Sequence, residues 1–185
     1  GFKRIVRKAA KLVLASSPEK FVNVEVAQVS AGSVLEGKTV VVTGGGRGLG
    51  LAMAEKFVSE GAKVVVSGRK EATLREACEK LGDAASYVVS DVSEAERAGE
   101  FLNACEAKLG GRIDCLVSNA GVSLHENRFD NVTIEGFDRQ FGTNMRGAYF
   151  LCREFLCRKE REKEPSGELL VITSETGEQA YDIPY

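Results

Sequence analysis

The sequence predicts an α/β fold in which helices cover both faces of a parallel β-sheet. From Gly37 onward, short apolar stretches alternate with longer stretches that have the amphipathic spacing of helices. The apolar stretches are hydrophobic through most of their length, as strands buried on both faces are. Strands separated by helices form βαβ units, whose strands lie parallel and whose crossovers are right-handed.

Five strands and four helical stretches are predicted in alternation along the chain. The strands are expected at 39–43, 63–67, 86–90, 113–118 and 169–173. The helical stretches are expected at 48–60, 70–81, 93–109 and 134–163. Each helical stretch separates two successive strands, which is the order of elements that a parallel sheet requires.

The composition is that of an ordinary globular protein. The chain is 43% hydrophobic and 28% charged, and its formal net charge of −2 gives no reason to expect nucleic-acid binding. No apolar run reaches the roughly 18–20 residues of a membrane span, and no secretory leader is evident. The five cysteines lack CxxC spacing, which favours reduced thiols in a cytoplasmic protein over a metal or disulfide site.

Residues 1–36 differ from the rest and are predicted to form an extension before a domain at 37–185. Residues 1–20 carry six basic side chains against one acidic side chain, and their apolar residues recur at helical spacing. Such a helix can lie on an anionic membrane or pack against protein, and we favour protein. The alternating residues 22–26 predict a short strand.

A glycine-rich loop after the first predicted strand predicts a site for nucleotide phosphates. It reads Thr43-Gly44-Gly45-Gly46-Arg47-Gly48-Leu49-Gly50. Glycine lets the chain turn sharply and lets phosphates approach the backbone, and the following helix presents free N–H groups to a pyrophosphate. The glycines fit TGxxxGxG rather than GxGxxG, and the lack of a following Gly-Lys-Ser/Thr excludes a Walker-type loop.

Four motifs together resemble those of the short-chain dehydrogenase/reductase family, classical type, over about residues 37–185. They are the TGxxxGxG loop, Asp91-Val92, Asn119-Ala120-Gly121 and Asn144. The resemblance implies a Rossmann-like, doubly wound sheet of strand order 3-2-1-4-5 and a homo-oligomer. It implies an oxidoreductase that transfers hydride between a nicotinamide cofactor and a carbonyl or alcohol. The implied cofactor-binding residues are Gly44, Gly46, Arg47, Gly48, Leu49, Gly50, Arg69, Asp91, Val92, Asn119, Ala120 and Gly121.

The end of the second predicted strand indicates which nucleotide is bound. Enzymes that prefer NAD place an acidic residue there to bind the ribose 2′-hydroxyl, whereas this chain reads Val66-Ser67-Gly68-Arg69-Lys70. No acid is present to repel a phosphate, and Arg69 can bind the 2′-phosphate of NADP. The resemblance places Arg47 at the same phosphate. We therefore expect NADP(H).

The catalytic residues that the resemblance implies are Asn144, Ser174 and Tyr185. Ser174 begins a serine-x-x-glycine stretch after the fifth strand and would hold the carbonyl oxygen. Tyr185, eleven residues later, fits the proton-donating tyrosine better than Tyr181, which would line the substrate loop. Asn144 would hold a water of the proton relay. The single histidine, His125, is expected to be a surface residue, with a substrate contact as the alternative.

In the family a lysine follows the tyrosine by four residues, which would fall beyond Tyr185. We therefore expect a chain truncated after the catalytic tyrosine, with five core strands and the C-terminal strands missing. A chain of this kind would bind nucleotide but would not oxidise NADPH by itself. The alternative is a non-catalytic dinucleotide-binding or scaffold subunit with the same fold.

Overall fold

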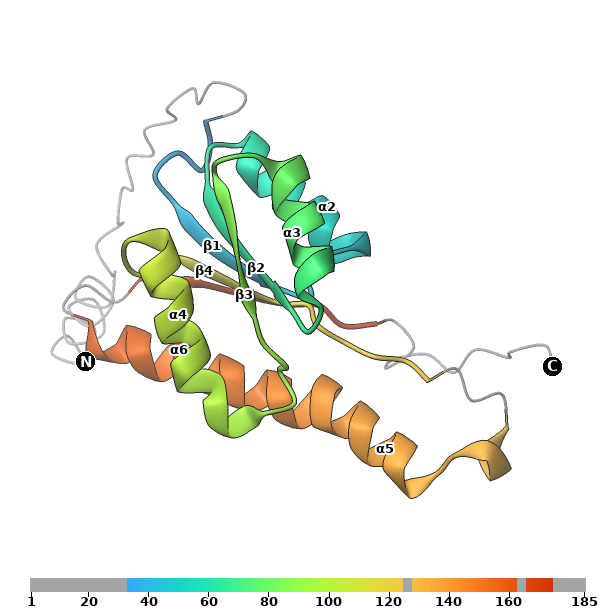
Figure 1. Cartoon of the computed structure of the whole chain (residues 1–185). Coiled ribbons are helices and arrows are strands. Elements are labelled where there is room, and N and C mark those ends of the chain that lie inside the picture. Colours follow the sequence, from blue (N-terminus) through green and yellow to red (C-terminus); the bar gives the residue numbers. More distant parts are fainter. Residues whose placement is uncertain (1–32, 125–127, 163–165, 175–185) are drawn as a thin grey trace, which may run out of the picture.

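The computed structural model describes residues 33–124, 128–162 and 166–174, which form a parallel sheet flanked by helices (Figure 1). Its strands are β1 (Thr39–Thr43), β2 (Lys63–Gly68), β3 (Ala85–Val89), β4 (Cys115–Ser118) and β5 (Glu168–Val171). They are ordered β3-β2-β1-β4-β5, and each neighbouring pair is parallel. The predicted Rossmann-like α/β fold and its strand order are confirmed.

Helices cover the two faces of the sheet in pairs (Figure 1). One face carries α2 (Gly48–Ser59) and α3 (Glu71–Leu81), and the other carries α4 (Ala98–Leu109) and α6 (Ala148–Arg161). The chain moves outward from β1 to β3 and then crosses back to β4. Because crossovers are right-handed, this reversal puts the later helices on the opposite face. It also leaves a crevice between β1 and β4 at the carboxyl edge of the sheet.

The central strands supply both cores of the domain. Val40–Val42 of β1 and Val64–Val66 of β2 are fully buried. In each triplet the middle valine packs toward α4 and α6, while the outer two pack toward α2 and α3. Each of these buried valines contributes on the order of 1.5 kcal/mol to folding. Two covered faces therefore explain the continuous apolar runs in the sequence.

The edge strands do not follow the prediction that every strand is buried on both faces. Leu170 and Val171 of β5 are 39% and 51% exposed, and β3 is only partly buried. Within the described residues each of these strands has a neighbour on one side alone. The predicted limits of the last four strands were also wrong by one or two residues, the fourth beginning at Cys115 rather than Ile113.

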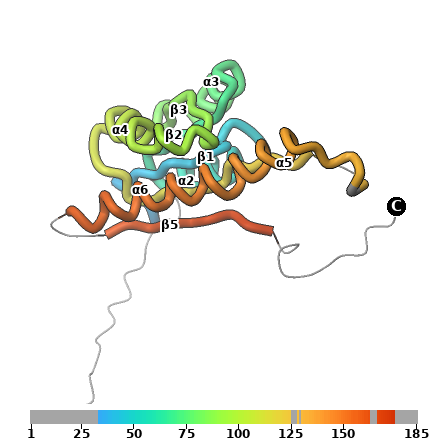
Figure 2. The backbone as a smooth tube through the Cα atoms, turned by 90° about the horizontal axis from the view of Figure 1, so that it is seen from below, coloured from blue at the N-terminus to red at the C-terminus, as the bar shows by residue number. Residues whose placement is uncertain are grey.

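The helical stretch predicted at 134–163 is three elements rather than one. α5 (Ile134–Phe141) leads into a π-helical segment, Gly142–Gly147, which leads into α6. The three elements form one rod, and α5 projects beyond the sheet (Figure 2). The prediction rested on hydrophobic spacing, which does not show where the backbone hydrogen bonds change to the i to i+5 pattern of a π-helix. Similarly, α4 is preceded by a 3₁₀ turn, Ala95–Arg97, inside the stretch predicted to be helix from residue 93.

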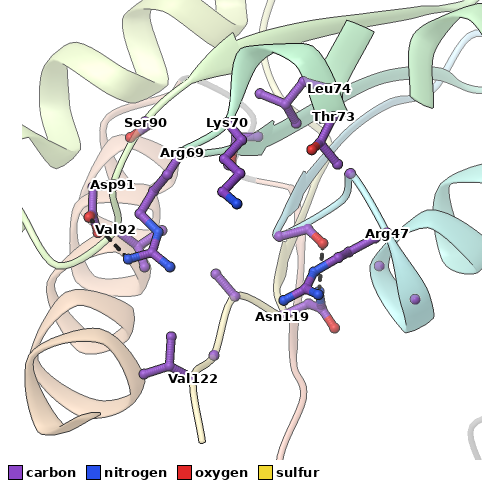
Figure 3. A pocket seen from close by; sticks show the side chains of 18 of the residues that line it. Arg47, Arg69, Lys70, Thr73, Leu74, Ser90, Asp91, Val92, Asn119 and Val122 are labelled. Carbon is purple, nitrogen blue, oxygen red and sulfur yellow. Dashed lines mark hydrogen bonds and ion pairs between the residues drawn. The ribbon is translucent and has the colours of Figure 1, made fainter. Parts of the chain in front are cut away.

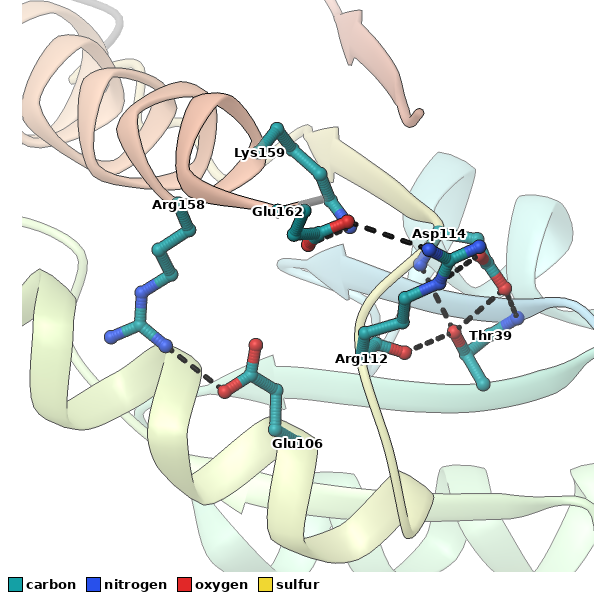
Figure 4. Close-up of polar contacts among 7 residues, drawn as sticks. All are labelled: Thr39, Glu106, Arg112, Asp114, Arg158, Lys159 and Glu162. Carbon is teal, nitrogen blue, oxygen red and sulfur yellow. Dashed lines mark hydrogen bonds and ion pairs between the residues drawn. The ribbon is translucent and has the colours of Figure 1, made fainter. Parts of the chain in front are cut away.

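Polar contacts fasten α6 to the domain at the edge opposite the crevice (Figure 4). Arg158 of α6 donates to the carboxylate of Glu106 in α4 at 3.1 Å. Lys159 is 8% exposed, and its ammonium lies 2.7 Å from Glu162, whose other carboxyl oxygen lies 3.5 Å from Arg112. The far end of α6 is thereby fixed to α4 and to the chain before β4.

Residues 1–32 of the predicted N-terminal extension, including its basic helix and the strand at 22–26, lie outside the described residues. His125, Tyr181 and Tyr185 lie outside them too. In the part of the chain that the structure describes, no helix is long and apolar enough to cross a membrane.

Candidate nucleotide-binding site

The structure places all twelve residues predicted to bind the cofactor around one pocket of about 690 Å³. The pocket lies at the carboxyl edge of the sheet, in the crevice between β1 and β4 where doubly wound sheets hold ligands. Eight further residues line it: Ser67, Gly68, Lys70, Thr73, Leu74, Ser90, Val122 and Thr143. Four of these, Gly68, Lys70, Ser90 and Val122, are direct sequence neighbours of predicted cofactor-binding residues, so adjacency to a motif would have found them.

Packing requires glycine at Gly44, Gly45 and Gly50, and a positive φ favours it at Gly44 and Gly48. Gly44 has a φ of +66°, and a Cβ there would lie 3.0 Å from the Cα of Ala120. A Cβ at Gly50 would lie 2.4 Å from the carbonyl oxygen of Gly44. Gly48 has a φ of +55° and open space in front of it. The loop therefore closes tightly on the turn after β4 and leaves room on the side of the pocket.

The first turn of α2 faces the pocket as a place for an anion. The helix begins at Gly48 without a side-chain cap, and its first turn holds no acidic residue. Its leading N–H groups keep free hydrogen-bonding capacity, and the positive end of the helix dipole points the same way. This arrangement suits a diphosphate.

The hydroxyl of Thr43 joins the end of β1 to the end of β4. Its oxygen accepts hydrogen bonds from the backbone N–H groups of Asn119 and Ala120, both at 3.0 Å. It donates to the carbonyl oxygen of Val117 at 3.2 Å. The side-chain amide of Asn119 donates to the carbonyl oxygen of Thr43 at 2.9 Å. Thr43 belongs to the predicted loop but was not among the predicted site residues.

Three basic side chains line the pocket, from the glycine loop and from the turn just after β2 (Figure 3): Arg47, Arg69 and Lys70. The guanidinium of Arg69 is half exposed and lies 4.0 Å from a carboxyl oxygen of Asp91. The other carboxyl oxygen of Asp91 accepts from the N–H and hydroxyl of Ser93, at 3.0 and 2.7 Å. Among the described residues that line the pocket, only Asp91 carries a carboxylate.

The acidic residue nearest to Arg69 in sequence is bound elsewhere. The carboxylate of Glu71 accepts a hydrogen bond from the hydroxyl of Tyr87 at 2.9 Å and pairs with Arg75 at 3.3 Å. Glu71 does not line the pocket. The end of β2 therefore presents positive charge to a ligand.

The hydroxyl of Ser67 is buried, lines the pocket and has no hydrogen-bond partner in the described part of the chain. Buried hydroxyl groups are almost always paired. A polar ligand at the end of β2 would supply the missing partner. This orphaned hydroxyl and the open loop at Gly48 both fit a nucleotide in the pocket.

Asn144 lies in the π-helical segment and holds the loop after β4. Its side-chain oxygen accepts from the N–H of Val122 and its side-chain nitrogen donates to the carbonyl oxygen of Val122, each at 2.8 Å. Its neighbour Thr143 is buried and lines the pocket. The π-helical segment thus forms part of the wall beside the turn that follows β4.

Comparison with known proteins identifies the family. A family model described as short chain dehydrogenase matches residues 38–183. The chain belongs to the short-chain dehydrogenase/reductase (SDR) family. An SDR of Pestalotiopsis microspora is 36% identical over 154 residues, which are 81% of this chain and 56% of the relative. A trihydroxynaphthalene reductase of Colletotrichum orbiculare is 36% identical over 159 residues, 83% of this chain and 54% of the relative.

Solved structures show the same fold. A 3-ketoacyl-(acyl-carrier-protein) reductase from Brucella melitensis, complexed with NADH, is 35% identical with a TM-score of 0.71, covering 77% of this chain and 59% of that one. A short chain dehydrogenase from Mycobacterium smegmatis is 28% identical with a TM-score of 0.75, and the match covers 84% of this chain and 66% of that one. The chain spans about half the length of the curated relatives it matches.

Of the three predicted catalytic residues, the structure describes Asn144 and Ser174. Ser174 lies just past β5, at the same edge of the sheet as the pocket, but it is exposed and does not line the pocket. Tyr185 lies outside the described residues, and Asn144 binds the loop after β4. The described residues thus gather the predicted cofactor-binding residues around one pocket.

Proposed function

We propose that this chain is the nucleotide-binding part of an SDR that transfers hydride between NADP(H) and a carbonyl or alcohol. The pocket carries the proposal, because it combines the glycine loop, the open first turn of α2 and the turn after β4 in one crevice. The nicotinamide cofactor supplies or accepts the hydride when bound. The names of two relatives support a nicotinamide cofactor and reductase chemistry, since one is a reductase complexed with NADH and another is a trihydroxynaphthalene reductase.

The charges at the end of β2 support a preference for NADP over NAD. Arg47, Arg69 and Lys70 line the pocket, and Glu71 is engaged by Tyr87 and Arg75. A hydrogen bond from arginine to a phosphate is worth about 1.5–3 kcal/mol, or roughly 10- to 100-fold in affinity. The 4.0 Å pairing of Arg69 with Asp91 is too exposed to compete with a bound phosphate.

Replacing Arg69 tests this preference. Arg69→Ala should raise the Kd for NADP⁺ by about 10- to 100-fold and leave the Kd for NAD⁺ within about threefold, measured by isothermal titration calorimetry. Arg153→Ala is the control, because Arg153 is an exposed arginine of α6 that does not line the pocket. An unchanged ratio of the two Kd values in Arg69→Ala would contradict the NADP proposal.

Ser174, Tyr185 and Asn144 are the proposed catalytic residues. In this role Ser174 holds the substrate oxygen, Tyr185 supplies the proton and Asn144 serves the proton relay. A full-length protein with Ser174→Ala should lose about 100-fold or more of its NADPH-dependent carbonyl reduction while its affinity for NADP⁺ stays the same. Nucleotide binding without any turnover in the full-length protein would favour the alternative, a non-catalytic dinucleotide-binding or scaffold subunit.

A second copy of the chain is the proposed protein partner. Large apolar side chains along α5 and the start of α6 are exposed: Ile134, Phe137, Phe141, Met145 and Tyr149. An apolar strip of this length on a helix is usually covered by another protein surface.

A further inference from the structure

We propose that Gly147 is a positioning residue for nucleotide binding. It lets the start of α6 lie directly on the backbone of Val92, and this contact holds the Asp91–Val92 wall of the pocket in place. Gly147 itself is buried and does not line the pocket. The inference rests on the proposed function, since it assigns a determinant of affinity to the same site.

The contact at Gly147 excludes any side chain. A Cβ on this residue would lie 2.0 Å from the carbonyl oxygen of Val92 and 2.7 Å from its carbonyl carbon, whereas ordinary contact begins at 3.4 Å. The backbone of Gly147 is right-handed helical, with φ of −64° and ψ of −47°, a conformation open to every residue. Glycine is therefore required here for space and not for backbone freedom.

The α6 helix cannot shift away from Val92 to make room for a side chain at Gly147. Leu151 and Phe155, one and two turns further along α6, are 3% and 2% exposed and belong to the core beneath the sheet. Arg158 then fastens the helix to α4, through Glu106 at 3.1 Å and the carbonyl oxygen of Gly99 at 2.7 Å. The part that can move is the loop that carries Val92.

That loop would move as a unit. The carboxylate of Asp91 accepts two hydrogen bonds from Ser93, and its backbone carbonyl accepts from the N–H of Glu94 at 3.1 Å. Displacement of Val92 is therefore passed to Asp91, and both residues line the pocket. Asp91 lies 4.0 Å from Arg69, the proposed ligand of the 2′-phosphate, so under the proposed function the displaced wall lies beside the adenosine half of the nucleotide.

The π-helical segment makes a second contact with the same loop. The guanidinium of Arg146 pairs with the carboxylate of Glu96, and both side chains are exposed. Asn144 meanwhile binds Val122 on the other side of the pocket. The segment Gly142–Gly147 thus contacts both the loop after β3 and the loop after β4. Its backbone lies closest to the loop after β3 where Gly147 meets Val92.

Two alanine substitutions in this segment test the proposal. Gly147→Ala should weaken binding of NADP⁺ and of adenosine 2′,5′-bisphosphate by about 10- to 100-fold, because displacements on the order of 1 Å cost that much at a preorganised site. Gly142→Ala is the matched control, because its Cβ would meet nothing closer than Ser93 at 4.0 Å. Its affinities should stay within about twofold of the unsubstituted chain.

A second ligand distinguishes a local change beside the adenosine half from a loss of structure across the whole pocket. Nicotinamide mononucleotide, titrated by NMR, should bind Gly147→Ala and the unsubstituted chain alike, since the displaced wall serves the adenosine half. Equal losses for both half-ligands would overturn the positioning role. Unchanged binding of adenosine 2′,5′-bisphosphate to Gly147→Ala would overturn it too, while leaving the proposed function intact. Failure of the unsubstituted chain to bind NADP⁺ would overturn the proposed function, and this inference with it.

If Gly147→Ala does not fold, the affinity of Arg146→Ala for adenosine 2′,5′-bisphosphate tests the proposal instead. This exposed change removes the second contact with the loop and introduces no clash. A loss of about two- to fivefold in affinity for adenosine 2′,5′-bisphosphate, the usual worth of an exposed ion pair, supports the proposal. An unchanged affinity would overturn it.

Discussion

Most of the residues around the pocket position main-chain segments, either by allowing them to approach closely or by hydrogen bonding to them. Gly50 permits a close approach of main-chain segments, while Thr43 and Asn144 bind main-chain groups of the turn after β4. Asp91 closes the turn after β3 with one of its carboxyl oxygens. Arg69 is one of few side chains left to contact a ligand. We therefore expect the backbone to bind what NAD and NADP share, and side chains to distinguish them.

The glycine spacing predicted the loop because part of its cause is local: a Cβ at Gly50 would lie 2.4 Å from the carbonyl oxygen of Gly44, six residues earlier. Thr43 and Gly147 were not predicted as site residues because their contacts are distant in sequence. The hydroxyl of Thr43 binds residues 76 and 77 positions away, and the space beside Gly147 is closed by Val92. Sequence spacing does not contain such distances, so only the fold reveals these two residues.

Two cysteine thiols lead to a prediction about alkaline stability. Burial raises the pKa of Cys105 from 9.0 to about 12 and that of Cys115 to about 11. The folded chain therefore holds these protons more tightly than the unfolded chain does. Their stabilising effect is complete below about pH 9 and is lost as the pH rises toward 12.

Cys105→Ala should therefore flatten the loss of stability with rising pH. Between about pH 8.5 and 11, its free energy of unfolding in urea should fall less steeply than that of the unsubstituted chain. At neutral pH the substitution should cost about 1 kcal/mol, because it leaves a small cavity in the core. Parallel curves for the two proteins would show that this thiol does not contribute to the alkaline transition.

Among the elements, the strands were predicted better than the long helix. Central strands carry unbroken valine runs because two faces are covered, and the composition of β1 and β2 records this directly. Edge strands β3 and β5 have similar apolar sequences but are partly exposed, because sheet position depends on the order of all strands. The π-helical segment escaped prediction for a related reason, since its wide turn is stabilised by contacts with two distant loops.

The link between β1 and β4 can be tested at Thr43. Thr43→Val keeps the shape of the side chain but leaves the N–H groups of Asn119 and Ala120 without their acceptor. The free energy of unfolding should fall by about 1–3 kcal/mol, measured by urea denaturation. Ser59→Ala is the control, because its hydroxyl bond to Lys56 is exposed and should be worth less than about 0.5 kcal/mol. Equal small losses at both positions would argue against a structural role for the Thr43 hydroxyl.

For the whole molecule, the direction of the chain through the sheet determines where its functional surface lies. The reversal after β3 creates the crevice, and the glycine loop, the turn after β3 and the turn after β4 all end at that edge. The same reversal places α4 and α6 together on the opposite face from α2 and α3. The rod of α5, the π-helical segment and α6 then extends past the sheet, where no other described element covers it (Figures 1 and 2).

The exposed strip on this rod predicts self-association of the chain. Its members recur three or four residues apart, and the rings of Phe137 and Phe141 stack with centroids 4.2 Å apart. A continuous strip on one rod can pair with the same strip of a second copy about a twofold axis. Because α5 contains no buried residue, substitutions there should leave the fold intact.

Phe141→Asp combined with Tyr149→Asp should therefore convert dimers into monomers in sedimentation equilibrium. The two positions are 45% and 64% exposed, so the introduced charges cost little in a monomer but would be buried without partners in a paired rod. Val34→Asp is the control, since that valine is 59% exposed and lies far from the rod in sequence. If the double substitution left the dimer dissociation constant unchanged, copies would have to pair through another surface, and the open edge at β5 would be the next to test.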